Sequence, residues 1–282
     1  MSRGDGFPPI SSKAILRACY AEIDEVWARF RHGQAIIRQP ELPPKILRGE
    51  GLARWIWRIS RIEGGLMPDT ATLDRNGVKP STLVRFWGGH GIMAQHFHIT
   101  TDSLVPFFLA IAIQTAANPE PLRLIRRDCL VPHPLDEHRI ILDWCKPKTG
   151  LRLKRAQRGS FDRRRRHAAP NLVEMMLALT EPIVAHAPPG QRDRLFLTRS
   201  VYEKLAHRTR RGRVEVIEPS VLARTIGGSS SAPTAASMPG TSRIRTTRKP
   251  GSSVSPRSCC AAASRPRIIA RRAVTFWSRS RS

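Results

Sequence analysis

Hydrophobic positions in the first hundred residues predict helices and no strand. Between Ser12 and Phe30, apolar residues recur at three- and four-residue steps, as in an amphipathic helix, and Ser11 or Ser12 is expected to cap it. Pro40 and the prolines after it end the pattern. Two later stretches repeat the helical spacing, the first of them with arginines 54, 58 and 61 on its exposed side. The expected helices cover 12–30, 50–62 and 80–87, with residues 63–80 as a loop.

The most apolar stretch begins near residue 101. From Leu104 to Ile113, hydrophobic residues surround the whole helix axis, which predicts a buried helix. Thr101 or Asp102 is expected to cap it. Asn118-Pro119 is expected to end it, because proline disfavours helical geometry in the preceding residue. At about 16 residues, this helix is too short to cross a bilayer.

The pattern then changes to that of a β-hairpin flanked by helices. Residues 139–144 are β-like, and the turn-forming run Lys146-Pro147-Lys148-Thr149-Gly150 leads to another extended stretch, so lysines are expected at the tip. A helix over 171–187 is expected to be interrupted at Pro182. Further expected elements are helices over 120–127 and 201–208 and an extended piece over 214–217. The predicted fold class is mainly α with a small antiparallel sheet.

Four segments of the chain occur in a recognisable order: Thr115–Asn118, Leu122–Asp128, Ile140–Lys148 and Arg194–Leu197. Their order resembles the entry to the catalytic domain of the tyrosine recombinases, the phage-integrase family. The resemblance covers roughly residues 100 to 200. It implies a helical arm that clasps DNA over residues 12–99 and an incomplete catalytic domain over residues 100–226.

The resemblance also implies a chemistry. In the family, a tyrosine attacks a DNA phosphate, two arginines and a His or Trp stabilise the charge, and a hairpin lysine protonates the leaving oxygen, with no metal or nucleotide cofactor. Lys146 is the first candidate for that lysine and Lys148 the second; an exposed turn lysine is the alternative for either. Asn118 stands where the first arginine belongs, and an amide cannot replace a guanidinium. Arg123 or Arg126 would have to reach in instead.

The remaining catalytic positions match poorly. His207 and Arg210 fit the spelling of the family's His-x-x-Arg step but come too soon after Phe196. The chain has two tyrosines, Tyr20 in the arm and Tyr202 before His207, and neither stands in the family's order. We therefore expect that this polypeptide does not cleave DNA, and whether any enzyme activity remains is left open.

Charge points to the partner. A net charge of +26 and a pI near 11.5 favour a polyanion, and DNA is the expected one. The cations are densest after the predicted hairpin turn, where they can follow a phosphate backbone. A solvated, arginine-rich loop is the alternative interpretation. The expected DNA-binding residues are Arg152, Lys154, Arg155, Arg158, Arg163, Arg164, Arg165 and Arg166.

Histidine and cysteine spacing gives little support to a metal site. His90, His96 and His98 lack a carboxylate or cysteine placed to complete a tetrahedral set. A second group, Cys129, His133, His138 and Cys145, is irregularly spaced. Five scattered cysteines fit a reducing cytoplasm better than a disulfide framework. No transmembrane run or signal peptide is apparent, so no membrane partner is expected.

The two ends of the chain are expected to lack fixed structure. Residues 1–11 are rich in glycine and proline, and residues 227–282 contain no Asp or Glu and no apolar periodicity. The second segment resembles an out-of-frame translation of a GC-rich gene. The hypothesis is a frame loss near residues 226–228, and an integrase-like continuation in another frame of the resequenced locus is the test.

Together these features predict a DNA-binding, integrase-like protein linked to site-specific recombination or integration. A homo-oligomer on DNA and a cytoplasmic, nucleoid-associated location are expected. One alternative is a nucleic-acid-binding accessory protein without recombinase ancestry. Another is a non-functional integrase remnant with uncovered core faces.

Overall fold

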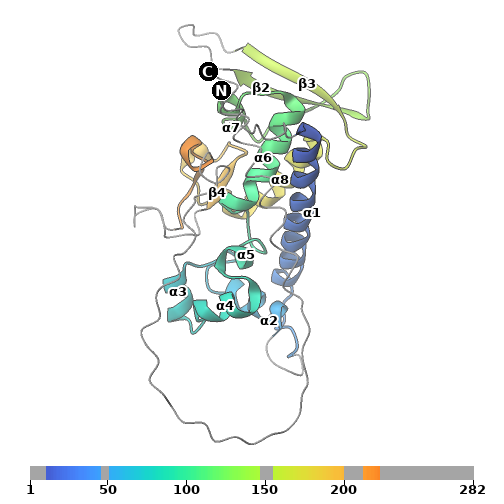
Figure 1. The fold of residues 1–282 in the computed structure, drawn as a ribbon. Coiled ribbons are helices and arrows are strands. Elements are labelled where there is room, and N and C mark those ends of the chain that lie inside the picture. The colour runs from blue at the N-terminus through green and yellow to red at the C-terminus, as the bar shows by residue number, and fades with distance from the viewer. Residues whose placement is uncertain (1–10, 46–50, 147–154, 200–211, 223–282) are drawn as a thin grey trace, which may run out of the picture.

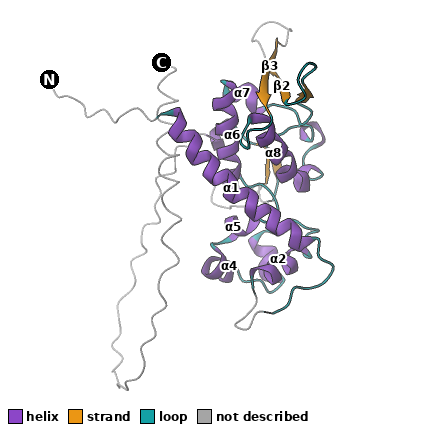
Figure 2. Ribbon diagram, turned by 90° about the vertical axis from the view of Figure 1, so that its right-hand side faces the viewer, coloured by secondary structure: helices purple, strands orange, loops and turns teal. Residues whose placement is uncertain are grey.

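The computed structural model describes residues 11–45, 51–146, 155–199 and 212–222. Helices make up most of this part of the chain, with one three-stranded and one two-stranded antiparallel sheet (Figures 1 and 2). The predicted fold class, mainly α with a small antiparallel sheet, is confirmed. The expectations for residues 1–10, 201–208 and 227–282 lie outside the described residues.

Helix α1 (Ser12–Ile37) is long and runs along most of the described part of the molecule (Figure 1). Ser11 caps it and accepts a hydrogen bond from the backbone N–H of Lys13 at 3.3 Å, as predicted. The predicted apolar stripe, including Ile23 and Phe30, is buried in the main hydrophobic core. Near the other end, Ile36 belongs to a second, smaller core. One continuous helix therefore contributes to both cores.

Four short helices surround the second core. They are α2 (Leu52–Ser60), α3 (Thr70–Arg75), α4 (Pro80–Trp87) and α5 (His90–Ala94). The prediction of a loop over 63–80 is wrong for α3. Asp69 caps this helix by accepting from the Thr72 N–H at 2.6 Å, and only Leu73 within it is buried, so hydrophobic spacing gave no signal.

Helix α6 (Thr101–Thr115) is buried on nearly all sides, as predicted. Its cap is Thr100, one residue before the predicted Thr101 or Asp102. Thr100 and Ser103 form a reciprocal capping box, with Ser103 Oγ accepting from the Thr100 N–H at 2.8 Å. Ala116, in the left-handed region at φ 50°, ends the helix. Helix α7 (Pro119–Arg123) stops four residues before the predicted end.

The three-stranded sheet has the order β1-β2-β3 and contains the predicted hairpin. Its strands are β1 (Leu130–Pro132), β2 (Arg139–Lys146) and β3 (Arg155–Asp162). Strand β2 runs two residues past the predicted end at Trp144, and Lys146 is paired with Arg155. The smaller sheet pairs β4 (Leu197–Arg199) with β5 (Val214–Val216), which confirms the extended piece expected there.

Helix α8 (Ala169–Val184) follows the hairpin, and a short 3-10 turn (Pro189–Gln191) comes after it. The predicted interruption at Pro182 is wrong. Pro182 cannot donate to the carbonyl four residues earlier and its ring crowds that carbonyl, but α8 ends two residues later, so both effects fall in the last turn of the helix. Met176 and Leu179 are among its fully buried residues.

The main core joins residues of α1, α6, α8 and both sheets. Among the described residues, the exposed large hydrophobic side chains are Leu42, Val84, Phe86, Val131 and Leu135. They lie in separate loops, helix α4 and the edge strand β1. No described helix combines the length and the apolar character that a membrane crossing requires. The predicted boundary between residues 99 and 100 stays a prediction.

Candidate nucleic-acid interface

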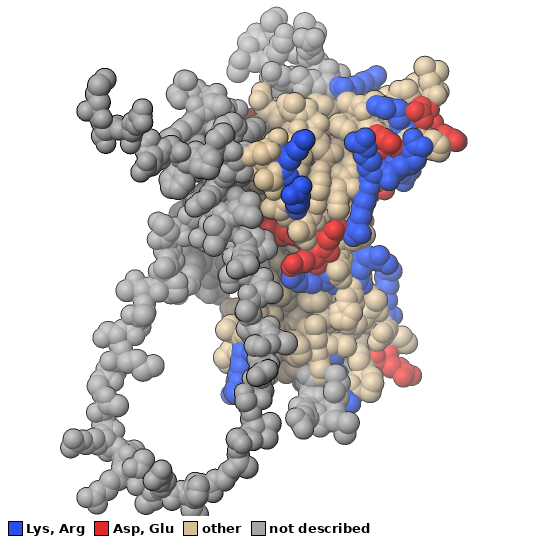
Figure 3. Space-filling view, turned by 45° about the vertical axis from the view of Figure 1, so that its right-hand side comes forward, with Lys and Arg blue, Asp and Glu red and all other residues tan. Residues whose placement is uncertain are grey.

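Four consecutive arginines, Arg163 to Arg166, form the loop that joins β3 to α8; we call it the arginine loop. All four side chains are exposed. On the face seen in Figure 3, Lys and Arg side chains gather around the sheet end of the molecule, with Asp and Glu side chains between them. The loop is thus a cationic surface with acidic neighbours.

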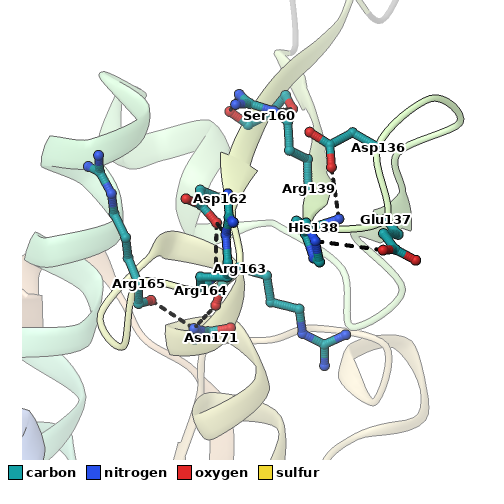
Figure 4. Close-up of polar contacts among 10 residues, drawn as sticks. All are labelled: Asp136, Glu137, His138, Arg139, Ser160, Asp162, Arg163, Arg164, Arg165 and Asn171. Carbon is teal, nitrogen blue, oxygen red and sulfur yellow. Dashed lines mark hydrogen bonds and ion pairs between the residues drawn. The ribbon is translucent and has the colours of Figure 1, made fainter.

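The backbone of the arginine loop is held at several points (Figure 4). Asn171, in the first turn of α8, donates to the carbonyl oxygens of Arg163 and Arg165, each at 2.8 Å. The N–H of Arg163 donates to the carbonyl of His138 at 2.9 Å. Asp162 accepts from the N–H of Arg164 at 2.9 Å, and this bond, with the charges of the neighbouring arginines, lowers the pKa of the Asp162 carboxyl. The cations therefore project from a fixed backbone.

Within the described part of the chain, three arginines of the loop reach a carboxylate. Arg163 contacts Glu174 at 2.7 Å, and Arg164 contacts Asp162 at 3.2 Å. Arg166 contacts Asp24 of α1 at 2.9 Å. Arg165 has no carboxylate partner among the described residues, although it lies close enough to help lower the Asp162 pKa.

Arginines on the hairpin strands also have polar partners. Arg158 lies directly opposite Asp143 in the β2–β3 register, and their side chains are 3.4 Å apart. Arg139 donates to both the Oγ and the carbonyl oxygen of Ser160, each at 2.8 Å (Figure 4). Arg139 is thus a further cation beside the loop, although the run of arginines alone did not identify it.

The other predicted DNA-binding and catalytic residues fall in or next to undescribed segments. The structure describes the backbone of Lys146 and Arg155, at the hairpin end of β2 and β3, but not their side chains. The role of Lys146 as a general acid stays a prediction. The expectations for Lys148, Arg152, Lys154, His207 and Arg210 lie outside the described residues.

The arginines considered as substitutes for Asn118 are occupied elsewhere. Asn118 itself is the residue before α7 and makes no side-chain cap there. Arg123 pairs with Glu120 at 2.6 Å, and Arg126 pairs with Asp128 at 3.0 Å. The next arginine, Arg127, is half-buried and donates to Thr180 and Glu181. Each of these guanidinium groups pairs with a carboxylate in the described structure.

Tyr20 has an unexpected position against the arginine loop. Its ring is stacked on the His167 ring, with centroids 4.4 Å apart and planes 7° apart. Gln114, at the end of α6, donates to the Tyr20 hydroxyl at 3.1 Å. Burial, with the neighbouring Cys19, raises the pKa of Tyr20, which disfavours the phenolate that a nucleophile needs. Tyr20 is therefore a packing residue in this arrangement, and Tyr202 lies outside the described residues.

The three histidines considered first as metal ligands bind the backbone instead. His90, His96 and His98 each contact a backbone carbonyl, those of Pro68, Arg29 and Ile99. Cys129 is a buried free thiol, and burial raises its pKa to about 12. Within the described ranges, no three His, Cys, Asp or Glu side chains converge as metal ligands would.

No protein-family model, curated protein or solved structure matches this chain.

Proposed function

We propose that this protein binds DNA as an integrase-like component of site-specific recombination or integration, and that it does not cleave DNA. The arginine loop carries the proposal. It presents four adjacent, exposed cations on a backbone fixed by Asn171 and Asp162, beside the basic β2–β3 hairpin. Such an arrangement suits a phosphate backbone, since successive phosphates can each accept from one guanidinium.

The ion pairs within the loop do not oppose this proposal. Exposed arginine–carboxylate pairs contribute only about 0.2–1 kcal/mol each. DNA binding adds the entropy of counterions released from the phosphates, which a single surface carboxylate does not provide. A phosphate backbone can therefore replace these carboxylates at moderate salt.

Recombinase ancestry is supported by the order of elements. A buried helix, a short helix, an antiparallel hairpin, another helix and a strand beginning after Leu195-Phe196 follow one another in the order that the resemblance implies. Asn118 in place of the first arginine and the packed ring of Tyr20 argue against strand cleavage. The proposal includes self-association on DNA and a location with the nucleoid.

Binding of the full chain to linear duplex and to four-way-junction DNA, measured by fluorescence anisotropy from 50 to about 300 mM salt, tests the proposal. We expect affinity for both to fall steeply with salt and the junction to be preferred. Steep but equal binding to both would favour an accessory nucleic-acid-binding protein instead. Salt-independent or absent binding would refute DNA binding altogether.

A suicide-substrate assay tests the catalytic part separately. We expect no covalent protein–DNA adduct from the full chain. An adduct that disappears in Tyr20→Phe or Tyr202→Phe would show that the chain retains a nucleophile, and would overturn the claim that it does not cleave.

A further inference from the structure

Two consecutive residues at the end of the arginine loop converge on a single oxygen atom. Arg166 Nη2 and His167 Nε2 each lie 2.9 Å from Oδ1 of Asp24. Asp24 comes from α1, 142 positions from Arg166 in the chain. Because a carboxylate only accepts, His167 must carry its proton on Nε2. Two donors thus form a fork around one anionic oxygen.

The histidine of the fork is held in place independently of Asp24. The His167 ring stacks on Tyr20, and Gln114 Nε2 donates to the His167 carbonyl at 2.8 Å and to the Tyr20 hydroxyl at 3.1 Å. Tyr20 therefore restricts one face of the His167 ring, Gln114 holds the His167 backbone, and the side chain is only 19% exposed. Arg166 is 67% exposed and can follow an incoming ligand.

We propose that the Arg166–His167 fork is a phosphate-binding site that Asp24 occupies in the free protein. This inference rests on the proposed DNA binding. A phosphodiester carries the same net charge as a carboxylate, and one of its non-bridging oxygens can accept from the same two donors. The exchange replaces one anion by another, so neither donor is left without a partner in the bound state.

The exchange connects DNA binding to helix α1. Asp24 ties α1 to the arginine loop through a polar contact, while its neighbours Ile23 and Val26 hold the helix in the main core. Displacing Asp24 removes only the polar tie. Asp24 therefore acts as an internal competitor that lowers the affinity of the loop for phosphate, without holding the fold together.

Asp24→Asn tests this inference in the full chain, with Glu25→Gln as the matched control. Each change removes one negative charge from adjacent positions of α1, but Glu25 pairs with Arg29, 2.8 Å away, and not with the loop. We expect Asp24→Asn to bind duplex DNA about threefold to fivefold more tightly than Glu25→Gln, the range that one or two surface ion pairs supply. Equal affinities would overturn the inference.

A double-mutant cycle identifies the partner. In an Arg166→Ala background, Asp24→Asn should bring no gain beyond that of Glu25→Gln, because the fork has lost its main cation. A full gain in that background would mean that Asp24 acts through general charge and would also overturn the inference. If wild type and Glu25→Gln both fail to bind DNA, the proposed function fails, and this outcome is distinct from equal, measurable affinities.

A measurement on the wild-type chain removes any dependence on how the variants fold. The ring nitrogen signals of His167, assigned with His167→Gln, should shift when duplex DNA is added, since Nε2–H changes its acceptor. Unshifted His167 signals at saturating DNA would contradict the site even if the affinities behave as expected.

Discussion

Arg165 is the residue of the arginine loop on which DNA binding can be tested most simply. Its side chain has no carboxylate partner among the described residues, so removing it breaks no ion pair there. We expect Arg165→Ala to weaken DNA binding and to reduce the slope of log K against log salt by about 1, the effect of one lost phosphate contact. Anisotropy titrations at four salt concentrations measure the slope.

Arg213→Ala is the control for this experiment. Arg213 is also exposed, but it lies just before β5 in the other sheet. The same loss of charge should leave the slope unchanged there. If both variants reduce the slope equally, binding follows total charge and the arginine loop has no special role.

His98 gives a pH dependence of stability. Burial lowers its pKa to about 4, with Arg199 and His90 acting in the same direction, against an ordinary value of 6.5. His98 is therefore protonated below about pH 6.5 in the unfolded chain but only below about pH 4 in the folded chain. Stability is complete above pH 6.5 and falls as the pH drops towards 4, by up to about 1.4 kcal/mol per pH unit for this histidine.

Urea unfolding of wild type and His98→Met at pH 7 and pH 5 tests this expectation. His96, whose pKa burial also lowers to about 4, remains in both proteins and contributes equally. We expect the difference in unfolding free energy between the two pH values to be smaller in His98→Met. The same difference in both proteins would show that His98 does not contribute.

At the residue scale, the sequence reveals cations better than their partners. The run Arg163–Arg166 was visible directly, whereas Asp24 lies 142 positions away and only the packing of α1 brings it to the loop. Asn171 could have been found, because an Asn in the first turn of a helix after a polar run often binds nearby backbone carbonyls. The stacking of His167 on Tyr20 depends on tertiary structure and had no local signal.

At the scale of elements, helix α1 packs at Gly33 directly against the backbone of His96, in the segment after α5. A Cβ atom on Gly33 would lie 2.0 Å from the carbonyl oxygen of His96 and 2.6 Å from its Cβ. We expect Gly33→Ala to destabilise the protein by about 1–3 kcal/mol, because the strain exceeds the roughly 1 kcal/mol gained from alanine's helix propensity. Thermal or urea unfolding measures the change.

Gly190→Ala is the matched control, since nothing lies within 4 Å of the added Cβ and its φ is not positive. We expect its unfolding free energy to stay within about 0.5 kcal/mol of wild type. A Gly33→Ala protein as stable as this control would show that α1 and the segment around His96 do not approach so closely.

Long apolar elements were predictable and short ones were not. The spacing in α1 and the all-round hydrophobicity of α6 are strong signals, and both helices were found. Helix α3 has six residues and a single buried side chain, so its cap at Asp69 was the available clue. Helix α7 ends early because the chain from Ile125 onwards pairs with residues 193–195, and that pairing is not local.

At the scale of the whole molecule, α1 contributes to both cores and the buried Arg199 adds a polar connection between them. Arg199 of β4 is 9% exposed and donates to Glu63 at 2.8 Å, to the Met67 carbonyl at 3.0 Å and to the Gly212 carbonyl at 3.2 Å. It therefore connects the loop after α2 to the small sheet. Because α1 continues through both cores, we expect the wild-type protein to unfold in a single transition.

Arg199→Met tests this connection, because it keeps an unbranched side chain but removes all three hydrogen bonds. We expect a loss of about 2–4 kcal/mol, somewhat below the usual cost of breaking a buried pair, since Glu63 is 31% exposed and regains water. Arg192→Met is the control: its guanidinium binds the carbonyls of Ala185 and Ala187 within one segment, so its loss should be smaller and local.

Two probes distinguish loss of stability from loss of coupling. Three of the five described tryptophans lie on α2 and α4 around the second core and two pack in the main core, so tryptophan fluorescence is weighted towards the second core, whereas helical circular dichroism reports on both cores. In wild type the two urea transitions should coincide, and in Arg199→Met the tryptophan transition should occur first, because the second core loses its tie to β4. Separate transitions in wild type would mean that the two cores are not coupled, and an unchanged midpoint in Arg199→Met would mean that Arg199 does not couple them.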